Sequence, residues 1–181
     1  MLGYYRDETL TKSVMDKQGW FHTGDVGYLE DGLFLHVTDR KKEIFKLSSG
    51  KFIAPQLLEN RIKESLFVDQ VMVVGEHQKF ASALLVPNFA FLKEWCMDRD
   101  IPVPRETSEW VCIPDVISIY QEEISKINQT LSVAERIQRI RIVPDEWSPK
   151  SGELSASLKL KRKVLESKYR ELLDSIYRIK S

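Results

Sequence analysis

The stretch Gly19-Trp-Phe-His-Thr-Gly-Asp25, with Arg40-Lys-Lys-Glu-Ile44 fifteen residues later, indicates more about the fold and function of this chain than any other part. A Thr-Gly-Asp turn lets another molecule approach the backbone closely, and the carboxylate of Asp25 can accept hydrogen bonds from two hydroxyls. That chemistry suits a ribose diol. The basic run that starts at Arg40 suits a phosphate, so the two runs together predict contact with a nucleotide.

Between these runs, residues 26–38 read as two strands joined by Asp31-Gly32. A type I′ hairpin turn prefers Asp-Gly because both central residues need a positive φ. One hairpin alone is only marginally stable in water, and residues 1–18 are polar and mixed. We therefore expect the first forty residues to have no core of their own and to belong to something larger.

From residue 43 onward, short apolar runs alternate with segments of helical spacing. Apolar strands flanked by Gly75 and Pro87 are typical of a sheet covered by helices. The sequence therefore predicts an α+β fold with a small sheet flanked by helices. The expected elements are a hairpin of 43–47 and 51–53, a helix that starts at Pro55 and carries Leu58, Ile62 and Leu66, strands at 70–74 and 83–86, a helix capped by Asn88, an amphipathic helix with Ile117, Tyr120, Ile124, Ile127 and Leu131, a strand at 140–143, a loop at 144–157, and a last helix with Leu165, Tyr169, Leu172 and Ile176.

The composition limits the partners to be expected. A chain of 181 residues, 43% hydrophobic and 30% charged, can bury the core of one ordinary domain, or of one domain plus part of another. Lys plus Arg equals Asp plus Glu at 27 each, so the net charge favours neither nucleic acid nor an anionic membrane as the main partner. Cys96 and Cys112 are too few for a disulfide framework, and no run approaches the roughly 20 apolar residues of a membrane span. We expect a cytoplasmic protein with no protein-bound metal, and a peripheral membrane contact stays open.

These motifs, in this order, resemble the adenylate-forming superfamily of acyl-CoA synthetases, nonribosomal peptide adenylation domains and luciferases. Residues 19–27, 39–44 and 158–162 are similar to phrases that recur in the same order in the C-terminal third of long-chain fatty acid:CoA ligases. The resemblance covers essentially the whole chain. It includes a helical insertion from about Phe89 to Glu135 that is typical of the long-chain branch.

The resemblance implies an ATP-dependent, AMP-forming ligase that works in two steps. A fatty carboxylate attacks the α-phosphate of ATP to give acyl-AMP and pyrophosphate, and the CoA thiol then displaces AMP. Magnesium would arrive with ATP, held largely by phosphates and water. The family's phosphate loop, adenine pocket and fatty-acid tunnel precede the segment resembled here. We therefore expect residues 1–41 to be the tail of the large domain and residues 42–181 to be the C-terminal lid domain, with the missing large domain as its partner and negligible activity of the chain alone.

By this resemblance, Asp25 would hold the ribose hydroxyls and Arg40 would contact ribose and phosphate oxygens. Lys42 falls at the hinge about which the family turns this domain between the two steps, and here it replaces the Asp of many relatives. Gly50 and Lys46 lie on the loop that lines the pantetheine channel for CoA in relatives. The simpler alternatives are an Asp25 that serves a turn, an Arg40 that is only solvated, and a Gly50 that the hairpin turn requires.

The catalytic lysine has two candidates. Lys150 lies in Pro149-Lys-Ser-Gly152, which is similar to the family signature Pro-Lys-Thr-x-Ser-Gly-Lys but lacks its terminal lysine. Residues 155–162 keep the hydroxyls, the lysine and the arginine three residues later in register, so we choose Lys159, with Leu158 where relatives have glycine. Its ammonium would reach the α-phosphate and carboxylate oxygens and offset the charge that develops there. The alternative is that Lys159 belongs to a solvated face at the start of the last helix.

Two other functions stay open from the sequence. The chain could be a stand-alone module that binds a nucleotide or an acyl carrier without catalysis. Nucleic-acid binding through residues 159–163 is a second alternative, against which the balanced charge argues. We expect exposed apolar residues on the hairpin, where the large domain should sit.

Overall fold

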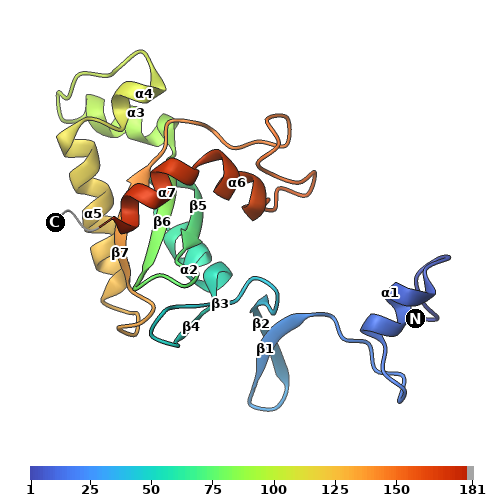
Figure 1. The fold of residues 1–181 in the computed structure, drawn as a ribbon. Helices are drawn as coiled ribbons and strands as arrows, with labels where there is room; N and C mark the ends of the chain where they lie inside the picture. The colour runs from blue at the N-terminus through green and yellow to red at the C-terminus, as the bar shows by residue number, and fades with distance from the viewer. Residues whose placement is uncertain (179–181) are drawn as a thin grey trace.

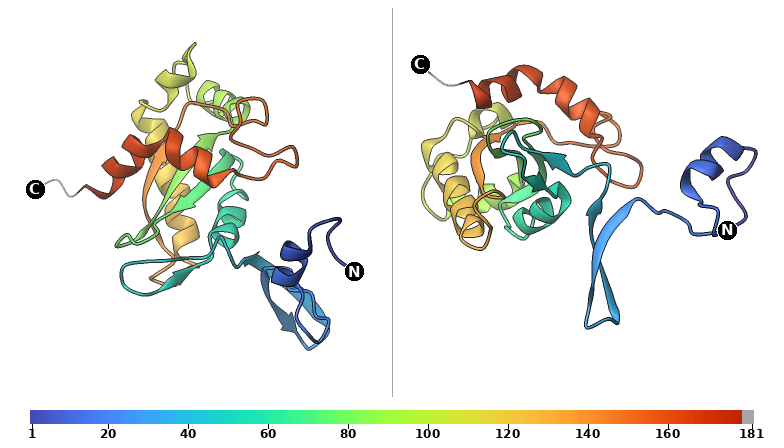
Figure 2. Two further views of the ribbon diagram at one scale, coloured as in Figure 1. Left: turned by 45° about the vertical axis from the view of Figure 1, so that its right-hand side comes forward. Right: turned by 60° about the horizontal axis from the view of Figure 1, so that its bottom comes forward.

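The computed structural model describes residues 1–178. A three-stranded sheet with helices on both faces forms the main body, and a hairpin with one short helix extends away from it (Figures 1 and 2). The helices are α1 (Glu8–Val14), α2 (Pro55–Ile62), α3 (Phe89–Met97), α4 (Thr107–Trp110), α5 (Pro114–Asn128), α6 (Arg162–Lys168) and α7 (Arg170–Tyr177). The strands are β1 (Asp25–Glu30), β2 (Phe34–Arg40), β3 (Phe45–Lys46), β4 (Phe52–Ile53), β5 (Val68–Val74), β6 (Ala81–Pro87) and β7 (Ile137–Ile142). The predicted α+β fold is confirmed.

The main sheet has the order β5-β6-β7, in which β5 and β6 are antiparallel and β6 and β7 are parallel. Side chains alternate between its two faces, and each face has its own core. Val71 and Val73 pack in the cluster that includes side chains of α2, α3 and α5, whereas Met72 packs in the cluster that includes side chains of α6 and α7. Burial on both faces explains why the strands predicted at 70–74 and 83–86 are continuously apolar.

Three details of the helices differ from the predictions. The helix that starts at Pro55 ends at Ile62, and Leu66 is 66% exposed, because the chain already turns there to enter β5. Leu131 is buried but lies beyond the end of α5. The last predicted helix is two helices that meet at Tyr169, whose hydroxyl donates to Asp145 Oδ2 at 2.8 Å and accepts from Trp147 Nε1 at 3.0 Å. These tertiary contacts fix the bend between α6 and α7.

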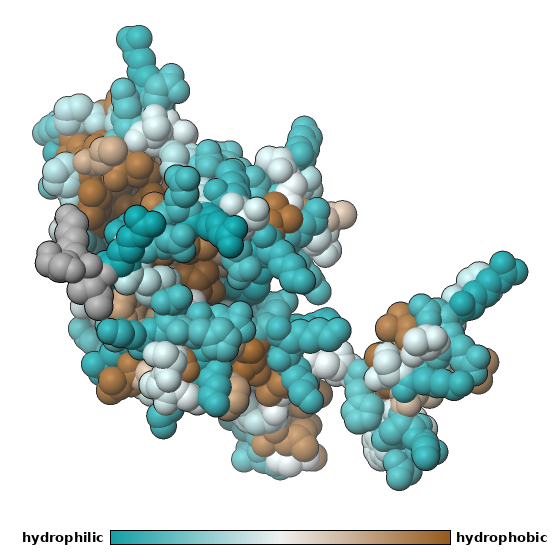
Figure 3. Space-filling model, in the orientation of Figure 1, coloured by the Kyte–Doolittle hydropathy of each residue, from teal (hydrophilic) through white to brown (hydrophobic). Residues whose placement is uncertain are grey.

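The N-terminal part confirms the predicted hairpin. β1 pairs with β2 in antiparallel register, and Asp31 and Gly32 have φ values of 52° and 68°, both positive as a type I′ turn requires. No residue before Asp39 is buried, so this part has no core, as expected. Figure 3 shows apolar side chains on the surface of the hairpin. The large apolar side chains of the hairpin that are 56% to 80% exposed are Tyr28, Leu29, Leu33, Phe34, Leu35 and Val37.

The short helix α1 was not predicted from the sequence. Its N-cap is Asp7, whose side chain accepts a hydrogen bond from the backbone N–H of Leu10 at 2.8 Å. None of its residues is buried, so it carries no apolar stripe that a search for helical periodicity would find.

Candidate functional site

Asp25 and Arg40 face each other across the open end of the β1–β2 hairpin. Their Cα atoms are partners in the ladder, and Arg40 Nε donates to Asp25 Oδ1 at 2.8 Å. The backbone N–H of Asp25 donates to Thr23 Oγ1 at 3.1 Å. Because 29% of the Asp25 side chain and 49% of the Arg40 side chain remain exposed, the pair offers an acceptor and a fork of donors to a ligand. This set of groups fits a ribose diol beside a phosphate.

Two glycines shape the backbone around this pair. Gly24 has a φ of +77°, in the region that favours glycine, and its carbonyl accepts from the N–H of Lys41 at 2.8 Å. At Gly27, next to a bulge in β1, a Cβ atom would lie 2.3 Å from the carbonyl oxygen of His36. Gly27, the last glycine of residues 19–27, therefore permits close strand pairing, a role that the sequence alone does not reveal.

Lys42 lies in the turn that connects the hairpin to the rest of the molecule (Figure 1). The backbone N–H groups of Glu43 and Ile44 both donate to the carbonyl of Arg40, at 2.8 Å and 3.2 Å. The side chain of Lys42 is exposed. Lys42 therefore lies at the centre of a hydrogen-bonded turn, with its side chain free of the core.

Lys46 and Gly50 lie together on the β3–β4 hairpin. Lys46 Nζ is 5.6 Å from the centre of the Phe52 ring, a cation–π distance. Gly50 has a φ of +86° and donates its N–H to the carbonyl of Leu47 at 2.9 Å, so the turn itself favours glycine. A Cβ atom there would lie 3.7 Å from Lys46 Cε, an ordinary contact. Beside this hairpin is a cavity of about 570 Å³, whose lining includes Ser49, Phe52 and Lys79.

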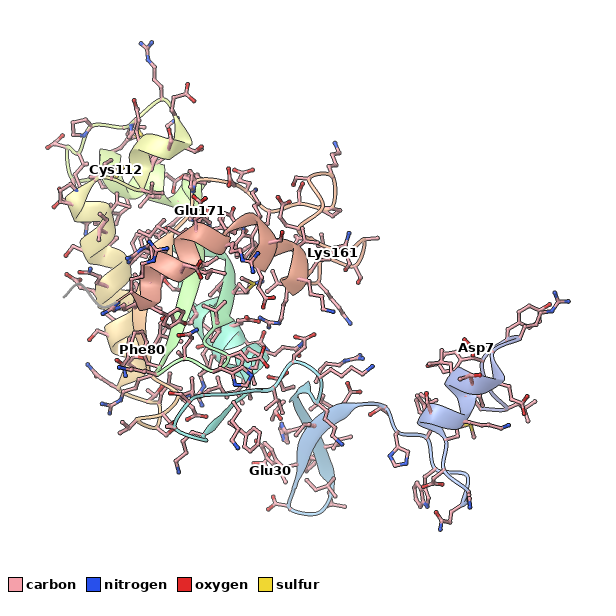
Figure 4. The ribbon with its side chains drawn as sticks, in the orientation of Figure 1. Asp7, Glu30, Phe80, Cys112, Lys161 and Glu171 are labelled. Carbon is pink, nitrogen blue, oxygen red and sulfur yellow. The ribbon has the colours of Figure 1, made fainter. Side chains whose placement is uncertain are left out.

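Lys159 lies on the loop before α6, with its side chain exposed. Ser155 holds the loop closed, because its Oγ accepts from Lys159 N at 3.1 Å and its N–H donates to Lys159 O at 2.8 Å. Leu158 has a φ of 60°, in the left-handed region that favours glycine. Figure 4, which labels Lys161, shows this loop projecting from the side of the sheet away from α5. Lys150 lies in a separate turn and is also exposed.

The structure brings Asp25 and Arg40 together but leaves Lys159 on a separate element. A small cavity of about 150 Å³ beside Lys159 is lined by Glu43, Glu59 and Arg162, not by Asp25 or Arg40. A second cavity, of about 690 Å³, lies between α5, β7 and α7 and includes none of the predicted site residues.

A largely buried arginine near Lys159, Arg162, was not predicted as a site residue. Arg162 NH2 donates to Glu59 Oε2 at 2.8 Å, its Nε donates to Glu43 Oε2 at 3.1 Å, and its NH1 donates to the carbonyl of Val73 at 3.3 Å. Burial raises the pKa of Glu59, and the attraction of Arg162 offsets this only in part. Glu43 lies in the motif of residues 40–44 and Arg162 in that of residues 155–162. Nothing in the sequence pairs either of them with Glu59.

Asp39 is a second buried polar residue that sequence reasoning missed. Its carboxylate accepts from the backbone N–H groups of Arg40, at 2.6 Å, and Gln56, at 3.0 Å. The second bond caps the start of α2 from a distant strand, while the helix's own N-cap residue, Ala54, makes no side-chain bond. Burial raises the pKa of Asp39, against the lowering effect of these two bonds.

Two absences apply to residues 1–178. No helix in this range is long and apolar enough to cross a membrane. No group of three or more His, Cys, Asp or Glu side chains in the same range could hold a metal ion.

Comparison with known proteins gives a family match and close similarity to several enzymes. The sequence profile of the AMP-binding enzyme C-terminal domain matches residues 42–181. Long-chain-fatty-acid–CoA ligase FadD15 of Mycobacterium tuberculosis is 32% identical over 175 residues, which cover 97% of this chain and 29% of that ligase. Long-chain-fatty-acid–CoA ligase 1 of Homo sapiens is 36% identical over 180 residues, which cover 97% of this chain and 25% of that ligase.

A solved structure shares the fold. The A domain of carboxylic acid reductase from Segniliparus rugosus, in complex with AMP and a co-purified carboxylic acid, matches with a TM-score of 0.76 and 27% sequence identity. The match covers 97% of this chain and 26% of that one. The chain therefore spans only about a quarter to a third of the length of the proteins that it resembles.

Proposed function

Because this chain belongs to the AMP-binding enzyme family, of which it carries the C-terminal domain, we propose that the protein that contains it is an ATP-dependent long-chain fatty acid:CoA ligase. Similarity to two long-chain-fatty-acid–CoA ligases over 97% of the chain supports this substrate class. The observation that carries the proposal is the Asp25–Arg40 pair, which offers a carboxylate and a guanidinium on a hairpin without a core.

The proposed reaction has two steps. In the first, a fatty carboxylate oxygen attacks the α-phosphorus of ATP. The bond from that phosphorus to the oxygen shared with the β-phosphate breaks, so that acyl-AMP and pyrophosphate form. In the second, the CoA sulfur attacks the acyl carbon, AMP leaves with the bonding electrons, and the thiol proton passes to solvent. Magnesium would accompany ATP and be held by its phosphates and water, not by a protein cage.

Two residues would bind the nucleotide in this proposal. The carboxylate of Asp25 would accept hydrogen bonds from the ribose hydroxyls, and Arg40 would donate to ribose and phosphate oxygens. Their 2.8 Å pairing supports these roles, since each side chain orients the other and both stay accessible. The positive charge of Arg40 would offset the negative charge of Asp25, which would otherwise repel a phosphate.

Lys159 would serve the first step. Its exposed ammonium, on a loop that projects from the lid, would approach the α-phosphate and offset the charge that develops on the phosphate and carboxylate oxygens. Because the cavity beside Lys159 is lined by neither Asp25 nor Arg40, Lys159 would reach the nucleotide only after the lid has turned. Lys42 would be the residue that absorbs the rotation.

The lid would serve the second step with another surface. Once the domain has turned, Gly50 and Lys46 on the β3–β4 hairpin would line the channel for the pantetheine arm of CoA. The cavity beside that hairpin supports this role. Residues 1–41 would be the tail of the large domain and residues 42–181 the lid, a division that the coreless and apolar hairpin supports.

The test is a product assay on the full-length protein. It is incubated with ATP, Mg²⁺ and fatty acids of several chain lengths, with and without CoA, and AMP, ADP, pyrophosphate and acyl-CoA are quantified. The proposal requires AMP and pyrophosphate only when a fatty acid is present, and acyl-CoA only when CoA is added. ADP as the product, or no dependence on a fatty acid, would overturn it. AMP binding without any turnover would point to a binding module instead.

A further inference from the structure

Arg162 ties the end of the Lys159 loop to α2, to β5 and to the turn at Lys42. It begins α6 three residues after Lys159, and its side chain is only 17% exposed. The start of the loop is held by Glu153, whose Oε1 accepts from Lys168 Nζ at 2.9 Å, and by the buried Leu154. Nearer to Lys159 the hydrogen bonds are local: Lys159 bonds with Ser155, and Lys161 N donates to Glu153 O at 2.8 Å. The guanidinium of Arg162 instead reaches groups that lie on three other parts of the chain.

Each acceptor of the Arg162 guanidinium is itself held in place. Glu59 Oε2 accepts from Arg162 while its Oε1 accepts from the backbone N–H of Val73 at 2.7 Å. Glu43 Oε2 accepts from Arg162 Nε and also from Gln56 Nε2, both at 3.1 Å. The fork of donors therefore has fixed partners on α2, on β5 and beside the turn at Lys42. A lysine at this position has one ammonium and could not satisfy three acceptors in these directions.

We propose that Arg162 is a positioning residue for the adenylation step. By holding Glu43, which follows Lys42 directly, and Glu59 on α2, it fixes the Lys159 loop relative to the hinge. When the lid turns, Lys159 then moves as part of a rigid body and arrives at a set place. This inference rests on the proposed ligase function and on Lys159 as the residue that reaches the α-phosphate.

The role predicts an unequal effect on the two half-reactions. Adenylation needs Lys159 within reach of the reacting atoms, and a misplacement of about 1 Å can cost about 100-fold in rate. The thioester step does not use Lys159, so it depends on Arg162 only through the overall fold of the lid. A purely structural role would lower both half-reactions together, because less of the protein would be folded.

The test uses the full-length enzyme with Arg162→Gln and, as a matched control, Lys163→Gln. Both variants lose one positive charge at adjacent positions of α6, but the Lys163 side chain is exposed. Adenylation is measured by fatty-acid-dependent exchange of pyrophosphate into ATP, and the second step by acyl-CoA formation from supplied acyl-AMP. We expect Arg162→Gln to lower the kcat of adenylation about 100-fold with little change in the KM for ATP. We expect its second step, and both steps of Lys163→Gln, to stay within about twofold of wild type.

Glu43→Ala is the second variant, since Arg162→Gln leaves the buried carboxylate of Glu59 without its partner and can prevent folding. It removes the hinge-side bond to Arg162, together with the bond from Gln56 Nε2, and leaves Arg162 bound to Glu59 and Val73. We expect a selective loss of adenylation of at least about tenfold, with an unchanged thermal unfolding temperature.

The outcomes separate this inference from the proposed function. A wild-type enzyme without fatty-acid-dependent exchange would overturn the proposed function and this inference with it. An active wild type whose Arg162 and Glu43 variants match Lys163→Gln would overturn only the positioning role. Equal losses in both half-reactions would also overturn it, in favour of a purely structural arginine.

Discussion

Glu153 gives the lid a pH-dependent stability that can be measured directly. Its side chain is 3% exposed, and Lys168 Nζ donates to its Oε1 at 2.9 Å. Burial alone would raise the pKa of Glu153, but hydrogen bonds from Ser151, Lys168 and the backbone lower it from the ordinary 4.5 to about 2. The folded state therefore binds the proton more weakly than the unfolded chain does.

The sign and size of the effect follow from this difference. A carboxylate with a depressed pKa in the folded state stabilises the fold above pH 4.5, and that contribution is lost as the pH falls toward 2. At neutral pH the contribution is at most about 3 kcal/mol, at 1.36 kcal/mol per pKa unit. Glu153→Gln keeps the shape of the side chain and removes its charge. The variant should therefore be less stable by about 2 to 3 kcal/mol at pH 7 and should lose less stability on acidification.

Urea denaturation of the 181-residue chain at a series of pH values tests this prediction. Tryptophan fluorescence follows unfolding, and of the four tryptophans Trp147 lies in this region, buried near Tyr169. Glu166→Gln is the matched control, because Glu166 is an exposed glutamate on the neighbouring helix α6. Wild-type stability of Glu153→Gln at pH 7 would contradict this prediction. So would an equal loss of the free energy of unfolding by wild type and Glu153→Gln between pH 5 and pH 2.

Three further substitutions test other parts of the account. Lys42→Pro in the full-length enzyme should spare acyl-AMP formation and suppress acyl-CoA formation, and equal loss of both half-reactions would argue against a hinge there. Leu158→Gly should raise the free energy of unfolding by up to about 1 kcal/mol, because it relieves a left-handed backbone, and a lower urea midpoint would contradict this. Tyr120→Phe removes the bond from the buried hydroxyl to the carbonyl of Phe67, 2.6 Å long, and should cost about 1 to 2 kcal/mol in urea denaturation, whereas unchanged stability would mean that the bond adds nothing.

The parts of the fold that local chemistry determines could be predicted from the sequence. Asp31-Gly32 marks the hairpin because only residues that tolerate positive φ fit that turn. The strands at 70–74 and 83–86 are readable because burial on both faces selects unbroken apolar runs. Asn88 marks the start of α3, where its side chain accepts from the N–H of Phe91.

The features that were missed depend on contacts between distant residues. Arg162 and Glu59 are 103 positions apart, and only the fold shows that α6 meets α2 at this point. Asp39 caps α2 through Gln56, which is 17 positions away, where a local reading expects the cap from a neighbouring residue. The break at Tyr169 depends on Asp145 and is invisible to a pattern of helical spacing that continues across it.

The candidate site divides in the same way. The sequence marks Asp25 and Arg40 as nucleotide-binding candidates, but their pairing depends on a bulge between Val26 and Gly27, which shifts the register by one residue and brings them opposite each other. Lys159 belongs to another element, and its approach to a nucleotide depends on a rotation that a single arrangement of the chain does not contain.

Lys159→Ala in the full-length enzyme tests the central claim most directly. The measurement is a single-turnover experiment with labelled ATP that follows acyl-AMP, alongside acyl-CoA formation from supplied acyl-AMP. The account predicts that the variant forms no detectable acyl-AMP from ATP and still converts supplied acyl-AMP to acyl-CoA. Formation of acyl-AMP at the wild-type rate would contradict the role of Lys159 and the assignment of this domain as the lid that delivers it.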